Sequence, residues 1–167
     1  MNLYLIRHAI ATTISPEGED SQRPLTDKGR TRMYRIAQGL KELGESIDLI
    51  LTSPYLRATQ TAQVLAKKLE VEKDKIIILE PLAPDGQAAD VIRTINDKYK
   101  DVENIALVGH EPYLSRLISL LLSGDPNLSI TLKKGSVCRL SIASLQAGRC
   151  ATLDWLLMPA QLVGIGG

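Results

Sequence analysis

The stretch NLYLIRHAIA, residues 2–11, starts as a continuous apolar run and ends in an arginine and a histidine followed by a small residue. A short apolar run without polar alternation is typical of a strand that is buried on both faces. The chain contains only two histidines, and one of them stands where this strand stops. The stretch therefore predicts a core strand that carries Arg7 and His8 at its carboxyl end.

Three further runs of the same kind follow, at 47–51, 75–79 and 105–108. Apolar residues at helical spacing follow each run, in stripes over 33–43, 55–69, 91–99 and 114–121. Four alternations of strand and helix predict an α/β fold, a three-layer α/β/α sandwich with a mostly parallel sheet. After Gly124 the pattern changes, and 136–143 and 151–158 are expected to form a C-terminal antiparallel hairpin with its turn at 146–149.

Length and composition limit the possibilities further. A chain of 167 residues predicts one domain, over 1–160, with the small, weakly patterned residues 161–167 as a loose tail. Twenty Lys and Arg against 19 Asp and Glu argue against a nucleic-acid or anionic-membrane partner. No apolar stretch is long enough to span a membrane, and the start lacks a signal-peptide pattern. Cys138 and Cys150 are isolated, which predicts reduced thiols and a cytoplasmic protein.

Both histidines are expected at one edge of the sheet. His8 follows the first strand, and His110 follows the fourth in ALVGHEP, residues 106–112. Ligands of parallel α/β sheets bind at the carboxyl ends of the strands. Each histidine alone could merely end a strand with a polar residue, but both together, with Arg7 beside one of them, favour a binding site.

The second strand adds another basic group to this edge. In LTSPYLRATQTA, residues 51–62, we expect Ser53 to be the N-cap of a helix and Pro54 to be its first residue. Arg57 would then lie about one turn into the helix. The N–H groups of a helix N-terminus attract anions, and an arginine beside them adds bidentate donors. The alternative is an ordinary surface arginine on an amphipathic helix.

Two arginines and two histidines suit a phosphoryl group. Guanidinium groups bind phosphate oxygens in a bidentate manner, and a neutral imidazole can attack phosphorus. The sequence has no H-x-H or H-E-x-x-H metal spacing and no phosphate-binding GxxxxGK[ST] loop. The arginines beside the histidines would also repel a metal cation. We therefore expect neither a metal nor a cofactor.

At these residues the chain resembles the histidine phosphatase superfamily. LIRHA is similar to its Arg-His-Gly signature, and TSPYLRATQTA and VGHEP are similar to the segments that carry its second arginine and second histidine. RPLTDKG at 23–29, KKGSVCRL at 133–140 and LDWLLMP at 153–159 resemble the small SixA-type phosphohistidine phosphatases within it. The resemblance extends over nearly the whole chain in the same order.

The resemblance implies a role for each site residue. His8 would be the nucleophile, neutral at its attacking nitrogen and oriented through its other nitrogen by a backbone hydrogen bond. Arg7, Arg57 and His110 would hold the phosphoryl oxygens and stabilise the transition state. Arg23 stays open between a further phosphate contact and an anchor for the loop that precedes the first helix.

Two positions depart from the family pattern. Ala9 stands where the signature usually has glycine, which is tolerable if the backbone does not need a positive φ. Many members carry a glutamate proton donor after the third strand, but LEPLAPDG, residues 79–86, has Pro84 there. Asp85 and Glu80 are near but out of register.

The missing acid bears on the substrate. Cleavage of a phosphate ester expels an alkoxide, and a positioned proton donor typically contributes 10²–10⁴-fold to such a step. Phosphohistidine expels an imidazole, whose pKa of about 6.5 lets it leave as a neutral molecule. Short connections leave no room for a capping subdomain, although the loop over 12–22 could partly cover the site. An open site of this kind favours P–N bonds on a protein.

These arguments predict a monomeric phosphatase that forms a phosphohistidine intermediate. Its expected partners are phosphate and a phosphorylated histidine-containing signalling or phosphotransfer protein. One alternative is a small-molecule or sugar phosphatase with Asp85 or Glu80 as the acid. Another is a phosphate-binding module without turnover, which His8 argues against because binding alone could use any donor there.

Overall fold

The computed structural model describes residues 1–167 and contains a single six-stranded sheet of order β3-β2-β4-β1-β5-β6. The strands are β1 (Asn2–Arg7), β2 (Leu49–Thr52), β3 (Ile76–Ile78), β4 (Asn104–Gly109), β5 (Val137–Ile142) and β6 (Ala151–Leu157). Strands β1 to β4 are parallel to one another, whereas β5 runs antiparallel to β1, and β6 antiparallel to β5. The predicted α/β fold with a C-terminal antiparallel pair is confirmed.

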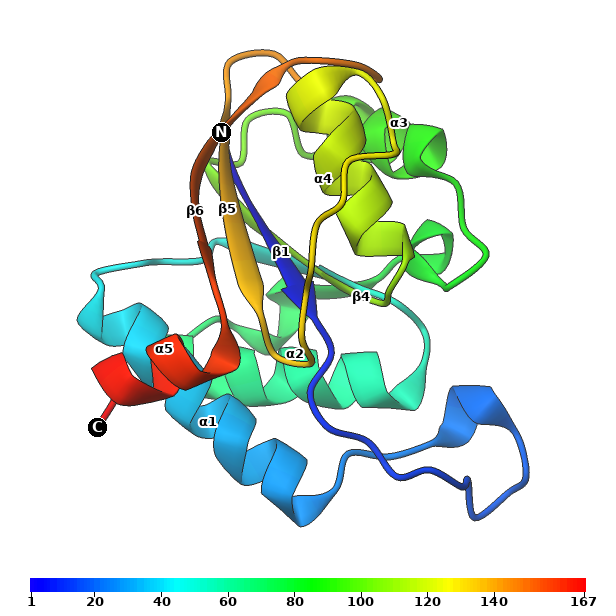
Figure 1. Ribbon diagram of the computed structural model, residues 1–167, viewed down its shortest axis with the longest axis vertical. Coiled ribbons are helices and arrows are strands. Elements are labelled where there is room, and N and C mark those ends of the chain that lie inside the picture. Colours follow the sequence, from blue (N-terminus) through cyan, green and yellow to red (C-terminus); the bar gives the residue numbers. More distant parts are fainter.

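Helices cover both faces of the sheet (Figure 1). Helices α3 and α4 lie on one face, and α1, α2 and α5 lie on the other. Their bounds are α1 (Asp27–Glu42), α2 (Leu56–Leu69), α3 (Ala88–Lys98), α4 (Tyr113–Ser123) and α5 (Pro159–Ile165), with short 3-10 turns at η1 (Asp20–Gln22), η2 (Lys73–Lys75) and η3 (Glu80–Leu82). None of these helices combines the length and the apolar character needed to cross a membrane.

Strand β1 shows why the apolar runs are continuous. Leu3 and Leu5 pack into the core under α3 and α4, whereas Tyr4 and Ile6 pack into the core under α1 and α2. Successive side chains of a strand point to opposite faces, so a strand covered on both sides needs an apolar residue at every position. Strand β3 departs from the expectation of full burial, because it is an edge strand and Ile78 is 58% exposed.

The segment between β1 and α1 is fixed at both ends. Thr26 caps α1, since its hydroxyl oxygen accepts a hydrogen bond from the N–H of Gly29 at 2.9 Å. The N–H of Thr26 donates to the carbonyl oxygen of Ile10 at 3.0 Å. A Cβ at Gly29 would lie 2.0 Å from that same oxygen, so glycine allows the helix to approach this closely. Both ends of the loop over 12–22 therefore lie beside the carboxyl end of β1.

The expected loose tail over 161–167 is wrong for 161–165, which belong to α5. This short helix packs against α1, and its Leu162 is fully buried. Gly39 of α1 makes the contact possible, because a Cβ there would lie 2.1 Å from the carbonyl oxygen of Leu162. This helix is hard to recognise in the sequence because a single fully buried leucine does not produce an apolar stripe.

We predict that Gly39→Ala destabilises the protein through this contact. The added methyl group has to displace the backbone of α5, and overpacking of this kind costs about 1–3 kcal/mol of the free energy of unfolding. Urea denaturation of the variant and the wild type measures the difference. Gly164→Ala is the matched control, since a Cβ there meets no atom within 4 Å. Equal stability of the Gly39→Ala variant and the wild type would show that α5 is not docked as described.

Candidate active site

The two histidines meet at the carboxyl ends of adjacent strands. Strand β1 pairs with β4 so that Arg7 lies opposite Gly109, and a histidine follows each strand directly. The N–H of His8 continues the ladder by donating to the carbonyl oxygen of Gly109 at 3.0 Å. The His8 and His110 ring centres are 5.2 Å apart, and both residues are buried. The structure thus brings together the histidines that the sequence placed at one sheet edge.

A backbone hydrogen bond orients the His8 ring. Its Nδ1 lies 2.7 Å from the carbonyl oxygen of Ala9. A carbonyl oxygen can only accept, so Nδ1 carries the proton and donates, and Nε2 keeps its lone pair. The Ala9 peptide is itself held, because its N–H donates to Thr61 Oγ1 at 3.0 Å and that hydroxyl donates to the carbonyl oxygen of Arg57 at 2.6 Å. The free lone pair of the His8 ring is therefore on Nε2.

Alanine is compatible with position 9. Ala9 does not have a positive φ, so the methyl group imposes no backbone strain. Its side chain is buried in the core on the α1 and α2 side of the sheet. The departure from the Arg-His-Gly pattern leaves the orientation of His8 intact.

Arg57 is a buried arginine whose partner the sequence analysis missed. Its Nη1 donates to the backbone carbonyl oxygen of Asp20 at 2.7 Å, and its Nη2 donates to the Asp20 carboxylate at 2.9 Å. The guanidinium carbon also lies 4.8 Å from the centre of the Tyr55 ring. A buried charge needs a counter-charge. Asp20, from the loop over 12–22, supplies it.

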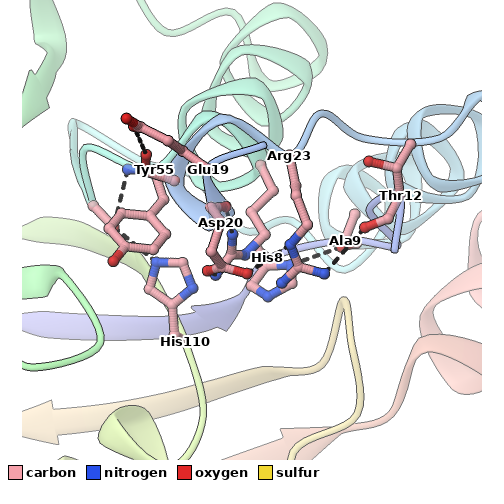
Figure 2. A network of polar contacts seen from close by, with 11 residues as sticks. His8, Ala9, Thr12, Glu19, Asp20, Arg23, Tyr55 and His110 are labelled. Atoms are coloured by element: carbon pink, nitrogen blue, oxygen red, sulfur yellow. Dashed lines mark hydrogen bonds and ion pairs between the residues drawn. The ribbon is translucent and has the colours of Figure 1, made fainter. Parts of the chain in front are cut away.

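Arg23 anchors this loop, which is one of the two roles that the sequence left open. Its Nε lies 2.7 Å from the Asp20 carboxylate, and its Nη1 donates to the carbonyl oxygen of Thr12 at 3.0 Å. Figure 2 shows the Asp20 carboxylate pointing toward the two imidazole rings. The loop therefore does reach over the site. The one sign of this in the sequence is the acid–base pair three residues apart in DSQR.

The start of α2 differs from the expectation. The helix begins at Leu56, with Tyr55 as its N-cap in an extended conformation, so Ser53 is not the N-cap and Pro54 is not the first helical residue. Arg57 is accordingly the second residue of the helix. The Ser53 hydroxyl is engaged elsewhere, because Oγ lies 2.7 Å from Nε2 of His110. It also accepts a hydrogen bond from the N–H of Tyr55 at 3.3 Å.

Burial and neighbouring positive charge keep both histidines neutral. Burial is the main cause that lowers the pKa of His8 to about 4, opposed by its hydrogen bond to Ala9 and reinforced by the charges of Arg57, Arg7 and Lys134. Burial likewise lowers the pKa of His110 to about 3, followed by repulsion between the two rings when both are protonated and by the charge of Arg57. At neutral pH both rings are uncharged.

Arg7 and Asp20 complete the charge distribution. Arg7 is fixed by a hydrogen bond from Nη1 to the carbonyl oxygen of Leu132 at 2.6 Å, and its charge acts on both imidazoles. Partial burial raises the pKa of the Asp20 carboxyl, but the hydrogen bond and charge of Arg57, together with those of Arg23, outweigh it. The net result is a pKa below the ordinary value. Asp20 is therefore an anion and not a proton donor at neutral pH.

The two candidate acids from the sequence lie outside this cluster. Glu80 begins η3, Asp85 lies in the turn after it, and both side chains are exposed. Neither forms a hydrogen bond or an ion pair with His8, His110 or the arginines. The carboxylate that contacts the arginines is Asp20.

The chain is similar to known proteins in both sequence and fold. Residues 3–82 match the family model of the histidine phosphatase superfamily (branch 1). A phosphohistidine phosphatase SixA homolog of Haemophilus influenzae is 30% identical over 128 residues, which cover 72% of this chain and 77% of that protein. The chain belongs to the histidine phosphatase superfamily.

Two further relatives span almost the full length. An uncharacterized protein of Picosynechococcus sp. is 35% identical over 98% of this chain and 99% of its own length. The structure of the protein histidine phosphatase SixA complexed with tungstate superposes with a TM-score of 0.84 at 25% identity, covering 97% of this chain and 99% of that one. The protein is thus a SixA-like phosphatase of this superfamily.

The low pKa values of the histidines predict a pH dependence of stability. A histidine with a depressed pKa in the folded state binds a proton more readily when unfolded. The contribution of each ring to stability is therefore greatest above pH 6.5 and is lost as the pH falls toward about 4 for His8 and about 3 for His110. We expect the free energy of unfolding, measured by urea denaturation, to decrease over this interval.

The double variant His8→Gln, His110→Gln should lose that part of the pH dependence. The lowered carboxyl pKa of Asp20 reduces stability only from about pH 5 downward and does so in both proteins, so the difference between the two proteins reports the histidines. The same slope between pH 6.5 and 4 in the double variant and the wild type would contradict the assignment of neutral, buried imidazoles.

Proposed function

We propose that this protein hydrolyses phosphohistidine on a protein substrate through a covalent phosphohistidine intermediate on His8. The observation that carries the proposal is the hydrogen bond from Nδ1 of His8 to the Ala9 carbonyl oxygen, at 2.7 Å. It leaves the lone pair on Nε2 of a neutral ring that lies beside a second neutral imidazole and among arginines. A neutral imidazole with one free nitrogen is a nucleophile toward phosphorus.

The surrounding donors suit the phosphoryl group. Arg7 and Arg57 offer guanidinium donors, which bind phosphate oxygens in fixed geometry and stay charged throughout the reaction. His110 lies next to His8 and would donate to a third oxygen. Arg23 would act through Asp20, by holding the loop over the site. The tungstate in the SixA structure is an oxyanion bound by a relative of the same fold, which supports oxyanion binding by this chain.

In the first step, Nε2 of His8 attacks phosphorus. A bond forms between Nε2 and phosphorus, and the bond between phosphorus and the substrate imidazole breaks. The electron pair of that bond stays on the substrate nitrogen. When the other nitrogen of the substrate ring carries a proton, the ring leaves as neutral imidazole. No proton has to be delivered by the protein.

In the second step, water attacks the phosphorylated His8. The bond between phosphorus and Nε2 breaks and its electron pair returns to Nε2. The water oxygen stays on phosphorus, and both water protons leave with the released phosphate as H2PO4⁻. Since Nδ1 already holds its proton on the Ala9 carbonyl oxygen, His8 also leaves as a neutral ring. The arginines and His110 stabilise the charge on the phosphoryl oxygens in both steps.

The carboxylates favour P–N over P–O substrates. Hydrolysis of an ester needs a proton donor at the leaving oxygen. Asp20 is held ionised by two arginines, and Asp85 and Glu80 are exposed and away from the histidines. A phosphohistidine substrate has no need of such a donor. The phosphorylated signalling or phosphotransfer protein predicted from the sequence is the partner that this chemistry suits.

We predict that His8→Ala abolishes turnover while the fold is retained, because the nucleophile is lost. Brief incubation of the wild type with a phosphohistidine protein carrying labelled phosphate should yield an acid-labile, base-stable phosphoenzyme, with the label located on His8 by mass spectrometry. His110→Ala is the matched control, since it keeps the nucleophile and should slow turnover with the label still on His8. Label on Ser53 or Thr59 would refute the mechanism.

We also predict the order of substrates. The wild type should hydrolyse a phosphohistidine protein with kcat/KM about 10²–10⁴-fold above that for a phosphoserine peptide or a sugar phosphate, the range that a missing general acid accounts for. Asp85→Asn and Glu80→Gln should change the phosphohistidine rate no more than severalfold. Efficient ester hydrolysis that collapses in Asp85→Asn would instead identify a small-molecule phosphatase.

A further inference from the structure

The second histidine has one paired nitrogen and one unpaired nitrogen. Nε2 of His110 lies 2.7 Å from Oγ of Ser53, a residue with no exposed surface. Nδ1 of His110 is also buried and has no hydrogen-bond partner. In Figure 2 the ring nitrogen of His110 on the side away from this contact faces toward Asp20 and His8.

The proton between Ser53 and His110 can be assigned by counting donors and acceptors. A serine hydroxyl has one donor and two acceptor positions, and Oγ of Ser53 already accepts from the N–H of Tyr55 at 3.3 Å. If Nε2 carried the ring proton, Oγ would accept twice and its own buried hydrogen would lack an acceptor. Such an unpaired buried group costs about 1–3 kcal/mol. If Nε2 is unprotonated, the hydroxyl donates to it, and the Nδ1–H of His110 is the one group of the pair that has no partner within the protein.

We propose that Ser53 is a positioning residue that fixes His110 as the Nδ1–H tautomer, so that this N–H donates to a phosphoryl oxygen. The tautomer rests on the hydrogen bonds of Ser53, and the use of the N–H rests on the proposed function. The two histidines then carry their protons on the same ring atom and use opposite nitrogens. His8 presents the lone pair of Nε2, and His110 presents the N–H of Nδ1.

The other neighbours of His110 control the ring but not its proton. The Tyr55 ring packs edge-on against His110 with centres 5.1 Å apart, and the Arg57 guanidinium packs on Tyr55. These contacts set the plane of the imidazole. Ser53 is the only hydrogen-bond partner of Nε2. Loss of its hydroxyl should therefore change the tautomer while the ring keeps its position.

The test is the ¹⁵N spectrum of the histidines, recorded with long-range ¹H–¹⁵N correlations at pH 7. The chain has two histidines, and His8→Ala assigns the pair. In the wild type we expect a protonated Nδ1 and an unprotonated Nε2 on His110. In Ser53→Ala the His110 signals should move to the Nε2–H tautomer or to an average of both, with His8 unchanged. Turnover should fall by roughly 10²-fold in kcat, the scale of one lost transition-state donor.

Two variants separate positioning from a general loss of structure. Ser119→Ala removes another fully buried serine hydroxyl, one that donates to the carbonyl oxygen of Asp125 beyond α4. It should lower the free energy of unfolding and leave the His110 spectrum and turnover unchanged. Ser53→Thr retains a hydroxyl and should retain both the Nδ1–H signals and most of the turnover.

The outcomes distinguish this inference from the proposed function. A wild-type spectrum with the His110 proton on Nε2 overturns the inference, even if phosphohistidine is hydrolysed and whether or not any variant folds. A Ser53→Ala variant with an unchanged tautomer and full turnover does the same. Conversely, the expected spectra in a protein that does not hydrolyse phosphohistidine support the tautomer and count against the substrate.

Discussion

The parallel pairing of β1 with β4 is the constraint on which the site depends. Because Arg7 lies opposite Gly109, the first residues beyond the two strands are brought to the same height at one edge of the sheet. The hydrogen bond from the N–H of His8 to Gly109 extends that register by one residue. A slip of one residue would turn His8 to the other face of the sheet and place its ring away from His110. The backbone pairing from Asn2 opposite Asn104 to Arg7 opposite Gly109 holds this register, and the Asn2 side-chain amide donates to the Asn104 amide oxygen at 2.8 Å where the pairing begins.

Burial then decides the charge states. Arginines stay protonated in a protein, so a site built from the buried Arg57 and the half-buried Arg7 carries fixed positive charge. Imidazoles in the same surroundings release their protons, as the low pKa values of His8 and His110 show. Asp20 compensates part of the charge and ties the loop over 12–22 to Arg57. The same electrostatics thus keep both imidazoles neutral, as the proposed attack on phosphorus requires, and keep the nearby carboxylate ionised.

The proposed chemistry has a simple symmetry. In the first step a P–N bond on the substrate is exchanged for a P–N bond on His8, so the leaving group and the nucleophile are the same kind of ring. The hydrogen bond to the Ala9 carbonyl oxygen keeps a proton on Nδ1 of His8. Because of that proton, His8 is a neutral leaving group in the second step. A site arranged in this way can work with positioned cations and two tautomers, and without a general acid.

The sequence by itself determined the layers and the parallel order of strand and helix, because hydrophobic periodicity is a local signal. It also determined that His8, His110 and the arginines meet, because ligand sites of parallel sheets lie at the carboxyl ends of the strands. It did not reveal that Asp20 pairs with Arg57, 37 residues away, or that Ser53 contacts His110, 57 residues away. It also assigned residues 161–165 to a loose tail instead of to α5. These features were decided by the tertiary structure. Both the partner of a hydrogen bond and the burial of a single leucine depend on how distant segments pack against one another. Contacts of this kind leave no periodic pattern in the sequence.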